Sequence, residues 1–172
     1  ILFQRQNYNE YRNLWWSRSD FKHPQKLTDA NPQQKTYNWG TVRLLQWTND
    51  EGKENKGLLY LPENYNPSYS YPMLVQFYET HSQDLFVYHT PSPSAAMADI
   101  PTFVSQGYIV FMPDIHFTVG NPGESCYNTV VSGVKMLIDQ GIADPQRIGL
   151  QGHSWSGFQT AYLVTRTSLF RC

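Results

Sequence analysis

The chain has 172 residues, of which 40% are hydrophobic and 15% aromatic, so it has enough apolar material for a domain core and is not a disordered chain. Its formal net charge of −1 gives no electrostatic case for nucleic acid as a partner. No apolar run reaches the ~20 residues of a membrane-spanning helix, so we expect no membrane insertion. We expect a soluble protein, and the periplasm and the cell exterior stay open as its compartment.

The first 36 residues differ from the rest of the chain. Aromatic and apolar residues alternate there with polar ones, and turn-forming residues close the segment at Leu27–Pro32. This pattern predicts short strands, which by themselves could not bury both of their faces. We therefore interpret residues 1–36 as the last piece of an all-β neighbour and residues 37–172 as part of a second domain.

The second domain opens with a pattern of three strands. An antiparallel hairpin is expected from strands at Val42–Trp47 and Gly57–Leu61, joined through a turn at Asn49–Gly52. A nearly continuous apolar run follows at Met73–Tyr78, as expected for a strand that is covered on both faces. The chain then leaves the sheet in a long loop over residues 79–94, and a loop of that length in a compact domain is often functional.

The remaining sequence alternates between helices and strands. It predicts, in order, a helix over 95–106, a strand over 108–112, a helix capped by Ser125 and ended by Gly141, a turn over 144–147 and a strand over 148–150. Because such alternation implies right-handed crossovers, we expect a mostly parallel sheet with flanking helices. With an antiparallel hairpin in front of it, the pattern best matches a partial α/β-hydrolase fold.

The segment after residue 150 has the layout of a nucleophile elbow, a sharp strand-to-helix turn that lifts a serine hydroxyl clear of the sheet. Small residues must flank such a turn, and Gly152 and Gly157 meet this need. Ser156 stands where the pattern has its second glycine, and it adds a side chain where helix and strand approach closely. We predict that Ser154 is a nucleophile and that the N–H of Trp155 points toward an oxyanion. The alternative is a small-residue turn without chemistry.

Further segments of the second domain carry a more specific signal. They are Trp47–Gly52, Gly57–Pro62, Tyr71–Val75, Tyr108–Asp114, Asp144–Gly149 and Gly152–Trp155. Together they resemble the catalytic domain of the prolyl oligopeptidase family of serine peptidases, over about residues 40 to 170. The resemblance implies an α/β-hydrolase peptidase domain over residues 37–172 and, in residues 1–36, the tail of a β-propeller-like domain. It also implies a peptide substrate, hydrolysed through an acyl-enzyme.

The resemblance assigns roles to three residues. Ser154 matches the nucleophile, Trp155 matches the residue whose amide supplies one oxyanion donor, and Tyr78 matches the tyrosine whose hydroxyl supplies the second donor. The chain departs from the family at three places. Glu79-Thr80-His81 replaces a glycine- and proline-rich turn, Ile115-His116-Phe117 replaces an arginine and glycine, and Ser156 replaces a glycine.

The other members of a catalytic triad are not found after the serine. A serine hydroxyl needs a base, and in α/β-hydrolases the acid and the histidine follow the serine in the chain. Residues 155–172 contain no Asp, Glu or His. The chain also begins without a methionine and stops soon after a helical pattern. We therefore expect a piece of a longer protein, with the acid and the base beyond Cys172, and no useful activity from the piece alone.

The remaining polar residues are interpreted as structural. His153 is expected to point away from the serine, and His23 belongs to the propeller-like tail. His81, His89 and His116 are interpreted as polar loop surface, with the rim of the site as the alternative. No two histidines have metal-ligand spacing on one element, so we expect neither a metal nor another cofactor. Asp114 is expected to hold a loop amide, and Cys126 and Cys172 are interpreted as free thiols.

Three functions stay open. A serine peptidase acting on oligopeptides is favoured by the resemblance. An esterase or acylaminoacyl hydrolase would use the same elbow, because both chemistries pass through an acyl-enzyme and an oxyanion. A non-catalytic relative would fit Ser156 and the altered loop at residues 79–81. Turnover of peptide amides against aryl esters separates the first two, and labelling by a fluorophosphonate separates both from the third.

Overall fold

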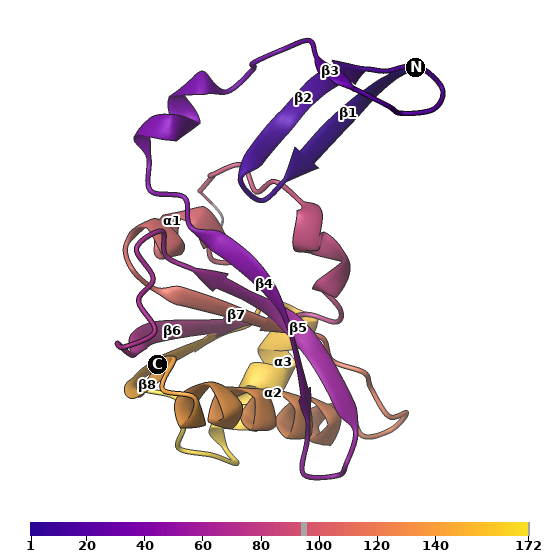
Figure 1. Ribbon diagram of the computed structural model, residues 1–172. Helices are drawn as coiled ribbons and strands as arrows, with labels where there is room; N and C mark the ends of the chain where they lie inside the picture. The colour runs from indigo at the N-terminus through magenta and orange to yellow at the C-terminus, as the bar shows by residue number, and fades with distance from the viewer. Residues whose placement is uncertain (94–95, 172) are drawn as a thin grey trace.

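The computed structural model describes residues 1–93 and 96–171, which form two β-sheets with flanking helices (Figure 1). The smaller sheet is antiparallel, with the order β1-β2-β3, and the larger one has the order β4-β5-β7-β6-β8. The strands are β1 (Leu2–Asn7), β2 (Glu10–Trp16), β3 (Gln25–Lys26), β4 (Thr41–Thr48), β5 (Glu54–Leu61), β6 (Tyr71–Gln76), β7 (Ile109–Pro113) and β8 (Ala143–Gln151). The helices are η1 (Pro32–Thr36), η2 (Ser82–Phe86), α1 (Ile100–Ser105), α2 (Pro122–Asp139) and α3 (Trp155–Val164), of which η1 and η2 are 3₁₀ helices.

The larger sheet begins antiparallel and continues parallel. β4 and β5 form the predicted hairpin, β5 pairs antiparallel with β7, and β6 pairs parallel with both β7 and β8. α1 lies in the crossover from β6 to β7, and α2 lies in the crossover from β7 to the edge strand β8. Because β6 and β8 run in the same direction, with Gln76 opposite Gln151, the chain leaves both strands at the same edge of the sheet.

Both faces of the larger sheet are buried, and successive residues of one strand serve opposite faces. Leu59 of β5 and Phe111 of β7 pack with α2 and α3 in one core, whereas Leu58 and Tyr60 of β5 pack toward α1 in the other. In Figure 1, α2 and α3 lie on one side of the sheet, and α1 and the N-terminal segment lie on the other. Coverage of both faces explains the apolar runs at Leu58–Leu61 of β5 and in β6 and β7, since these parts of the strands lie between two packed layers.

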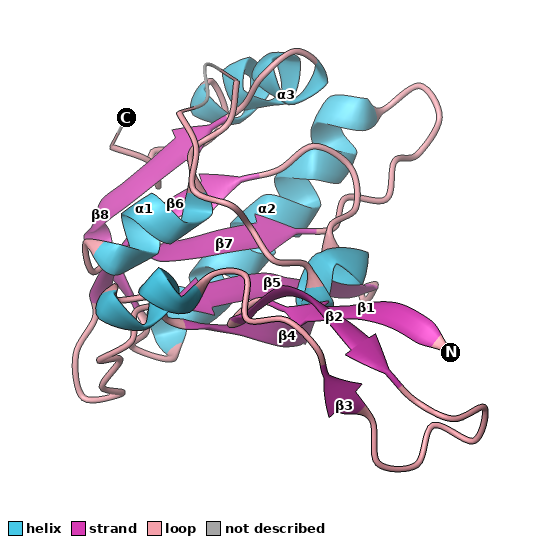
Figure 2. Ribbon diagram, turned by 90° about the horizontal axis from the view of Figure 1, so that it is seen from above, coloured by secondary structure: helices cyan, strands magenta, loops and turns pink. Residues whose placement is uncertain are grey.

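The N-terminal hairpin is fastened to the second core by aromatic residues. Tyr8, in the turn between β1 and β2, is 1% exposed, and its hydroxyl donates to the Trp39 carbonyl at 3.1 Å, while Trp39 Nε1 donates to the Tyr8 carbonyl at 2.6 Å. The Tyr8 ring meets that of Tyr60 in β5 edge to face, at 5.1 Å between centroids. The turn at Tyr8 therefore contacts the larger sheet and supplies a buried side chain to its core. Seen from above, β1 and β2 overlap β4 and β5 (Figure 2), but Figure 1 shows that they extend away from that sheet.

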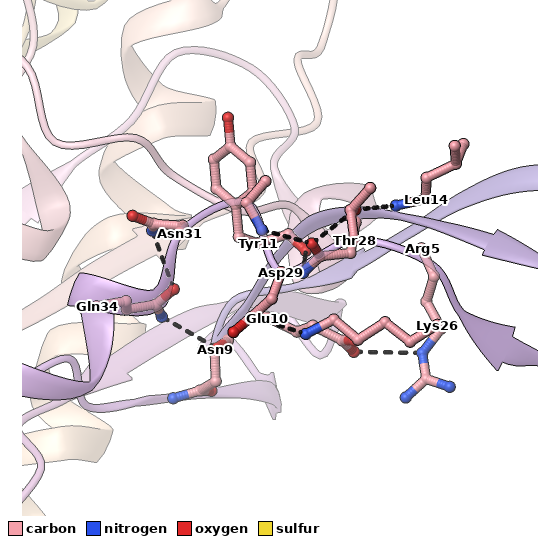
Figure 3. A network of polar contacts seen from close by, with 12 residues as sticks. Arg5, Asn9, Glu10, Tyr11, Leu14, Lys26, Thr28, Asp29, Asn31 and Gln34 are labelled. Carbon is pink, nitrogen blue, oxygen red and sulfur yellow. Dashed lines mark hydrogen bonds and ion pairs between the residues drawn. The ribbon is translucent and has the colours of Figure 1, made fainter.

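Amide side chains hold the segment that connects the two sheets (Figure 3). Gln34 in η1 donates to the Asn9 carbonyl at 3.0 Å, and Asn31 donates to Gln34 Oε1 at 3.3 Å and to the Tyr88 hydroxyl at 2.8 Å. Asn13 of β2 is 2% exposed, and its Oδ1 accepts from the Ala30 amide at 2.9 Å. These hydrogen bonds fix the backbone of the turn that was predicted near residues 27–32. The short helix η1, which follows this turn in the chain, was not predicted from the sequence.

Two predicted helix starts are wrong, and prolines explain both. The helix predicted over 95–106 begins at Ile100, with Asp99 as its cap, because Pro101 lacks an N–H and its ring would clash within a longer helix. Residue 95 lies outside the described residues. α2 begins at Pro122 rather than after Ser125, since proline is favoured in the first turn. The Ser125 hydroxyl instead accepts from the Thr118 amide at 2.9 Å and donates to the Asn121 carbonyl at 2.9 Å.

Strand boundaries of β6 and β8 also differ from the prediction. β6 ends at Gln76, because its ladder with β8 ends there, and Tyr78 follows in a bend instead of inside the strand. β8 begins at Ala143, so the predicted turn over residues 144–147 lies within the strand as an irregularity of its register with β6. Asp144 makes that turn by accepting from the Gln146 amide at 2.9 Å, and both this hydrogen bond and one from Arg147 lower the pKa of its carboxyl group.

Candidate active site

The predicted strand–turn–helix surrounds Ser154. β8 ends at Gln151, α3 begins at Trp155, and Ser154 between them has φ 55° and ψ −115°. A positive φ is strained for a residue with a side chain, and it persists only where the surroundings enforce it. Ser154 is exposed, and within the described part of the chain its hydroxyl has no hydrogen-bond partner. The turn therefore presents this hydroxyl to solvent at the edge of the sheet.

The two glycines of the elbow differ in how much space surrounds them. A Cβ added to Gly152 would lie 2.3 Å from the Ser156 carbonyl oxygen and 2.3 Å from Thr160 Oγ1, which no side chain tolerates. A Cβ added to Gly157 would come no closer than 3.7 Å, an ordinary contact. The close approach predicted from the sequence therefore requires glycine at position 152, and the prediction that it also restricts position 157 is wrong.

Ser156 fits the elbow without crowding it. The residue is 0% exposed, and its Oγ accepts a hydrogen bond from the His153 amide at 2.9 Å and donates one to the His153 carbonyl at 3.0 Å. The Ser156 amide donates to the same carbonyl at 3.1 Å. The added side chain therefore makes specific bonds across the turn that holds Ser154.

Trp155 combines a backbone donor with an aromatic cluster. Its amide is in the first turn of α3, where N–H groups lack partners within the helix, and no hydrogen bond occupies it among residues 1–93 and 96–171. Its ring stacks on Phe158 at 5.6 Å and meets Phe117 edge to face at 5.6 Å. Phe117 comes from the loop after β7, so this cluster joins that loop to the elbow.

Tyr78 lies two residues beyond the end of β6, and Ser154 lies three residues beyond the end of the adjacent β8. Parallel pairing therefore places both on the same edge of the sheet. Tyr78 is 38% exposed, and no hydrogen bond to its hydroxyl exists within the described ranges. This hydroxyl is consequently available as a donor.

Asp114 fixes the loop that follows Tyr78, as the sequence predicts. It is 0% exposed, and its Oδ1 accepts from the amides of His81 at 2.6 Å and Ser82 at 2.8 Å, with Lys56 Nζ 4.0 Å from Oδ2. The Ile115 amide donates in turn to the Glu79 carbonyl at 2.7 Å. Because these bonds occupy the amides of residues 81 and 82, those two groups are not available to bind an oxyanion.

Two of the histidines, His81 and His89, make contacts with residues other than Ser154. His89 Nε2 lies 3.2 Å from the Tyr60 hydroxyl, inside the aromatic junction with the N-terminal hairpin, and burial lowers the pKa of this imidazole. His81 Nδ1 lies 3.4 Å from Asp84 Oδ2. The interpretation of His89 as loop surface is therefore wrong: it is a partly buried neighbour of Tyr8 and Tyr60.

Among the described residues, Cys126 is a buried free thiol, and burial raises its pKa above the usual range; Cys172 lies outside them. Within the same residues, no helix is long and apolar enough to cross a membrane.

The order of the larger sheet and the elbow at its edge define an α/β-hydrolase fold. The predicted resemblance to the prolyl oligopeptidase family is confirmed, since the model of that family matches residues 94–172. The chain is also similar to the solved structures of the AtxE2 isopeptidase (18% identity, TM-score 0.70) and an acylaminoacyl peptidase from Pyrococcus horikoshii (16% identity, TM-score 0.70). Oligopeptidase B from Trypanosoma brucei is a third similar structure, with 13% identity and a TM-score of 0.68. No curated protein matches the chain.

These similarities cover nearly all of the chain but only part of each relative. The alignments include 98% of this chain for the isopeptidase, 99% for the acylaminoacyl peptidase and 98% for oligopeptidase B, and they cover 28%, 28% and 25% of those chains. The chain therefore spans about a quarter of the length of the structures it matches. The predicted fold class is confirmed, and a propeller-like N-terminal segment fits these structures, whereas the domain boundary at residues 36 and 37 stays a prediction.

Proposed function

We propose that this chain is part of a serine-type peptidase that hydrolyses peptide bonds of oligopeptides, with Ser154 as its nucleophile. The observation that carries the proposal is the exposed Ser154 at φ 55°, next to the Trp155 amide at the start of α3, which has no hydrogen-bond partner among the described residues. The strained backbone keeps the hydroxyl away from the sheet, and the helix N-terminus favours negative charge nearby. The match of the family model to residues 94–172 supports the same assignment.

The proposed reaction has two covalent steps. Ser154 Oγ attacks the carbonyl carbon of the scissile bond while its proton passes to a base, and the carbonyl oxygen becomes an oxyanion that accepts a hydrogen bond from the Trp155 amide. The C–N bond then breaks, and the amine leaves with the proton from the base. Water, deprotonated by the same base, then attacks the acyl carbon. The bond between that carbon and Ser154 Oγ breaks, the carboxylic acid product leaves, and the base returns the proton to Ser154 Oγ.

The second oxyanion donor is proposed to be the Tyr78 hydroxyl. Support comes from its place on the edge that carries Ser154, and from the hydroxyl's lack of a partner within the described part of the chain. The hydrogen bonds to Asp114 reduce the number of other groups that could be the second oxyanion donor, because they occupy the amides of His81 and Ser82. The backbone amides of residues 79, 80 and 83 are the remaining backbone donors of residues 79–83.

The acid and the base are proposed to follow Cys172 in the complete protein, because residues 155–172 supply neither. We accordingly expect the 172-residue chain alone to show no turnover of peptide amides.

Active-site labelling of the complete protein tests the assignment of Ser154. The parent should react with a fluorophosphonate and hydrolyse peptide amides, and Ser154→Ala should lose labelling and reduce hydrolysis by ~10⁴ to 10⁶-fold. Ser168→Ala, at an exposed serine of the same region, is the matched control and should behave as the parent. Labelling retained by Ser154→Ala contradicts the proposal, a parent that is never labelled points to a non-catalytic relative, and turnover of aryl esters without amides points to an esterase.

A further inference from the structure

The hydroxyl of Ser156 bonds to both peptide groups that flank residue 153. The His153 N–H belongs to the peptide that joins it to Gly152, and the His153 carbonyl belongs to the peptide that joins it to Ser154. Ser156 Oγ is 2.9 Å from the first group and 3.0 Å from the second. One side chain thereby fixes the relative orientation of the two peptide planes immediately before Ser154.

A glycine at position 156 could make only part of this arrangement. It would keep the bond from the residue 156 amide to the His153 carbonyl, 3.1 Å here, and would lose both bonds of the hydroxyl. Ser156 is 0% exposed, so water has little access to replace those bonds. The backbone of Ser156 is also fixed from the next turn of α3, because Thr160 Oγ1 donates to the Ser156 carbonyl at 2.8 Å.

The plane that Ser156 fixes is the plane that carries the nitrogen of Ser154. Rotation of this peptide changes φ of Ser154, and with it the direction of Oγ and of the following Trp155 amide. Since φ of Ser154 is 55°, the unstrained alternatives lie at negative φ, away from the elbow conformation. A constraint on the 153–154 peptide therefore opposes relaxation of the nucleophile.

We propose that Ser156 is a positioning residue, which holds Ser154 in its reactive orientation through two hydrogen bonds to His153. The proposal rests on the proposed function of Ser154 as a nucleophile. Glycine is usual at this place in the elbow pattern. The proposal therefore also gives a role to the serine that stands there, because its hydroxyl holds the turn by hydrogen bonds that glycine could not make.

The test compares Ser156→Ala, Ser156→Gly and Ser156→Thr in the complete protein by the kinetics of fluorophosphonate labelling. The dependence of labelling rate on reagent concentration separates the maximal rate constant from the affinity for the reagent. Ser156→Ala and Ser156→Gly should lower the maximal rate constant by about tenfold to hundredfold, the effect expected when a reacting group is misplaced by up to ~1 Å, and leave the affinity within about twofold. Ser156→Thr keeps the hydroxyl and should recover most of the rate.

Thr165→Val is the matched control, because the Thr165 hydroxyl also donates to a carbonyl three residues back, that of Tyr162, but at the far end of α3. It should label at the parental rate. Parental rates for both Ser156→Gly and Ser156→Ala overturn the inference, as does a loss of thermal stability without a loss of rate. If Ser154→Ala is still labelled, the proposed function fails instead, and that result is distinguishable from a failure of the Ser156 proposal.

Discussion

Gly152→Ala should damage the elbow through space alone. The new Cβ would meet the Ser156 carbonyl oxygen and Thr160 Oγ1 at 2.3 Å each, whereas ordinary contacts begin at 3.4 Å. The Thr160 hydroxyl can rotate, but the Ser156 carbonyl is part of the α3 backbone, so the helix must move by about 1 Å. Overpacking of this kind costs about 1–3 kcal/mol, and we expect the upper part of that range because the obstacle is backbone.

Gly157→Ala is the control for this substitution. Its Cβ would come no closer than 3.7 Å to another residue, and alanine within a helix is favoured over glycine by about 1 kcal/mol. Urea unfolding of the complete protein should therefore give a lower unfolding free energy for Gly152→Ala and an equal or higher one for Gly157→Ala. Labelling of Ser154 should slow only in the first variant. Equal stability and equal labelling of the two variants would refute the close approach as the reason for glycine at position 152.

Three further predictions address the loop and the aromatic junction. Tyr78→Phe should lower kcat by ~10² to 10³ with KM little changed, and steady-state hydrolysis at the parental rate would move the second donor to another group of the loop at residues 79–83. Asp114→Ala leaves two partly buried amides without an acceptor, so the unfolding free energy should fall by about 2–4 kcal/mol, whereas Asp114→Asn, which keeps an acceptor, should lose less; equal losses in urea unfolding contradict this. Because burial lowers the pKa of His89, the folded state binds fewer protons there than the unfolded state, so the unfolding free energy should fall as the pH drops from about 7 to 5. His89→Gln should reduce this slope, and an unchanged slope would assign it to other groups.

The elements with strong local patterns could be predicted from the sequence. The apolar runs of β5, β6 and β7 are continuous because the sheet is covered on both faces, and this pattern is visible without a structure. The elbow was predictable for a similar reason, since small residues around a serine between a strand and a helix have few other uses. Two helix starts were predicted wrongly, although Pro101 and Pro122 in the first turns of α1 and α2 are a signal in the sequence that could have located them.

Contacts between residues distant in sequence could not be predicted. The alternating pattern of residues 1–16 indicates strands, but it does not show that Tyr8 in the turn between them is buried against Tyr60. His89 looks like a loop residue until the fold brings it to Tyr60, 29 positions earlier in the chain. Ser156 departs from the elbow pattern, and only the structure shows that its hydroxyl bonds to both the amide and the carbonyl of His153.

The burial of Tyr8 has a practical consequence for dividing this protein. Expression from residue 37 onward, at the predicted boundary, would remove the ring that covers Trp39 and Tyr60 and the hydroxyl that bonds the Trp39 carbonyl. Aromatic surface uncovered in this way favours aggregation. Soluble expression of the hydrolase part is therefore expected to need the hairpin at residues 2–16, and polar replacements at Trp39 and Tyr60 are the alternative route.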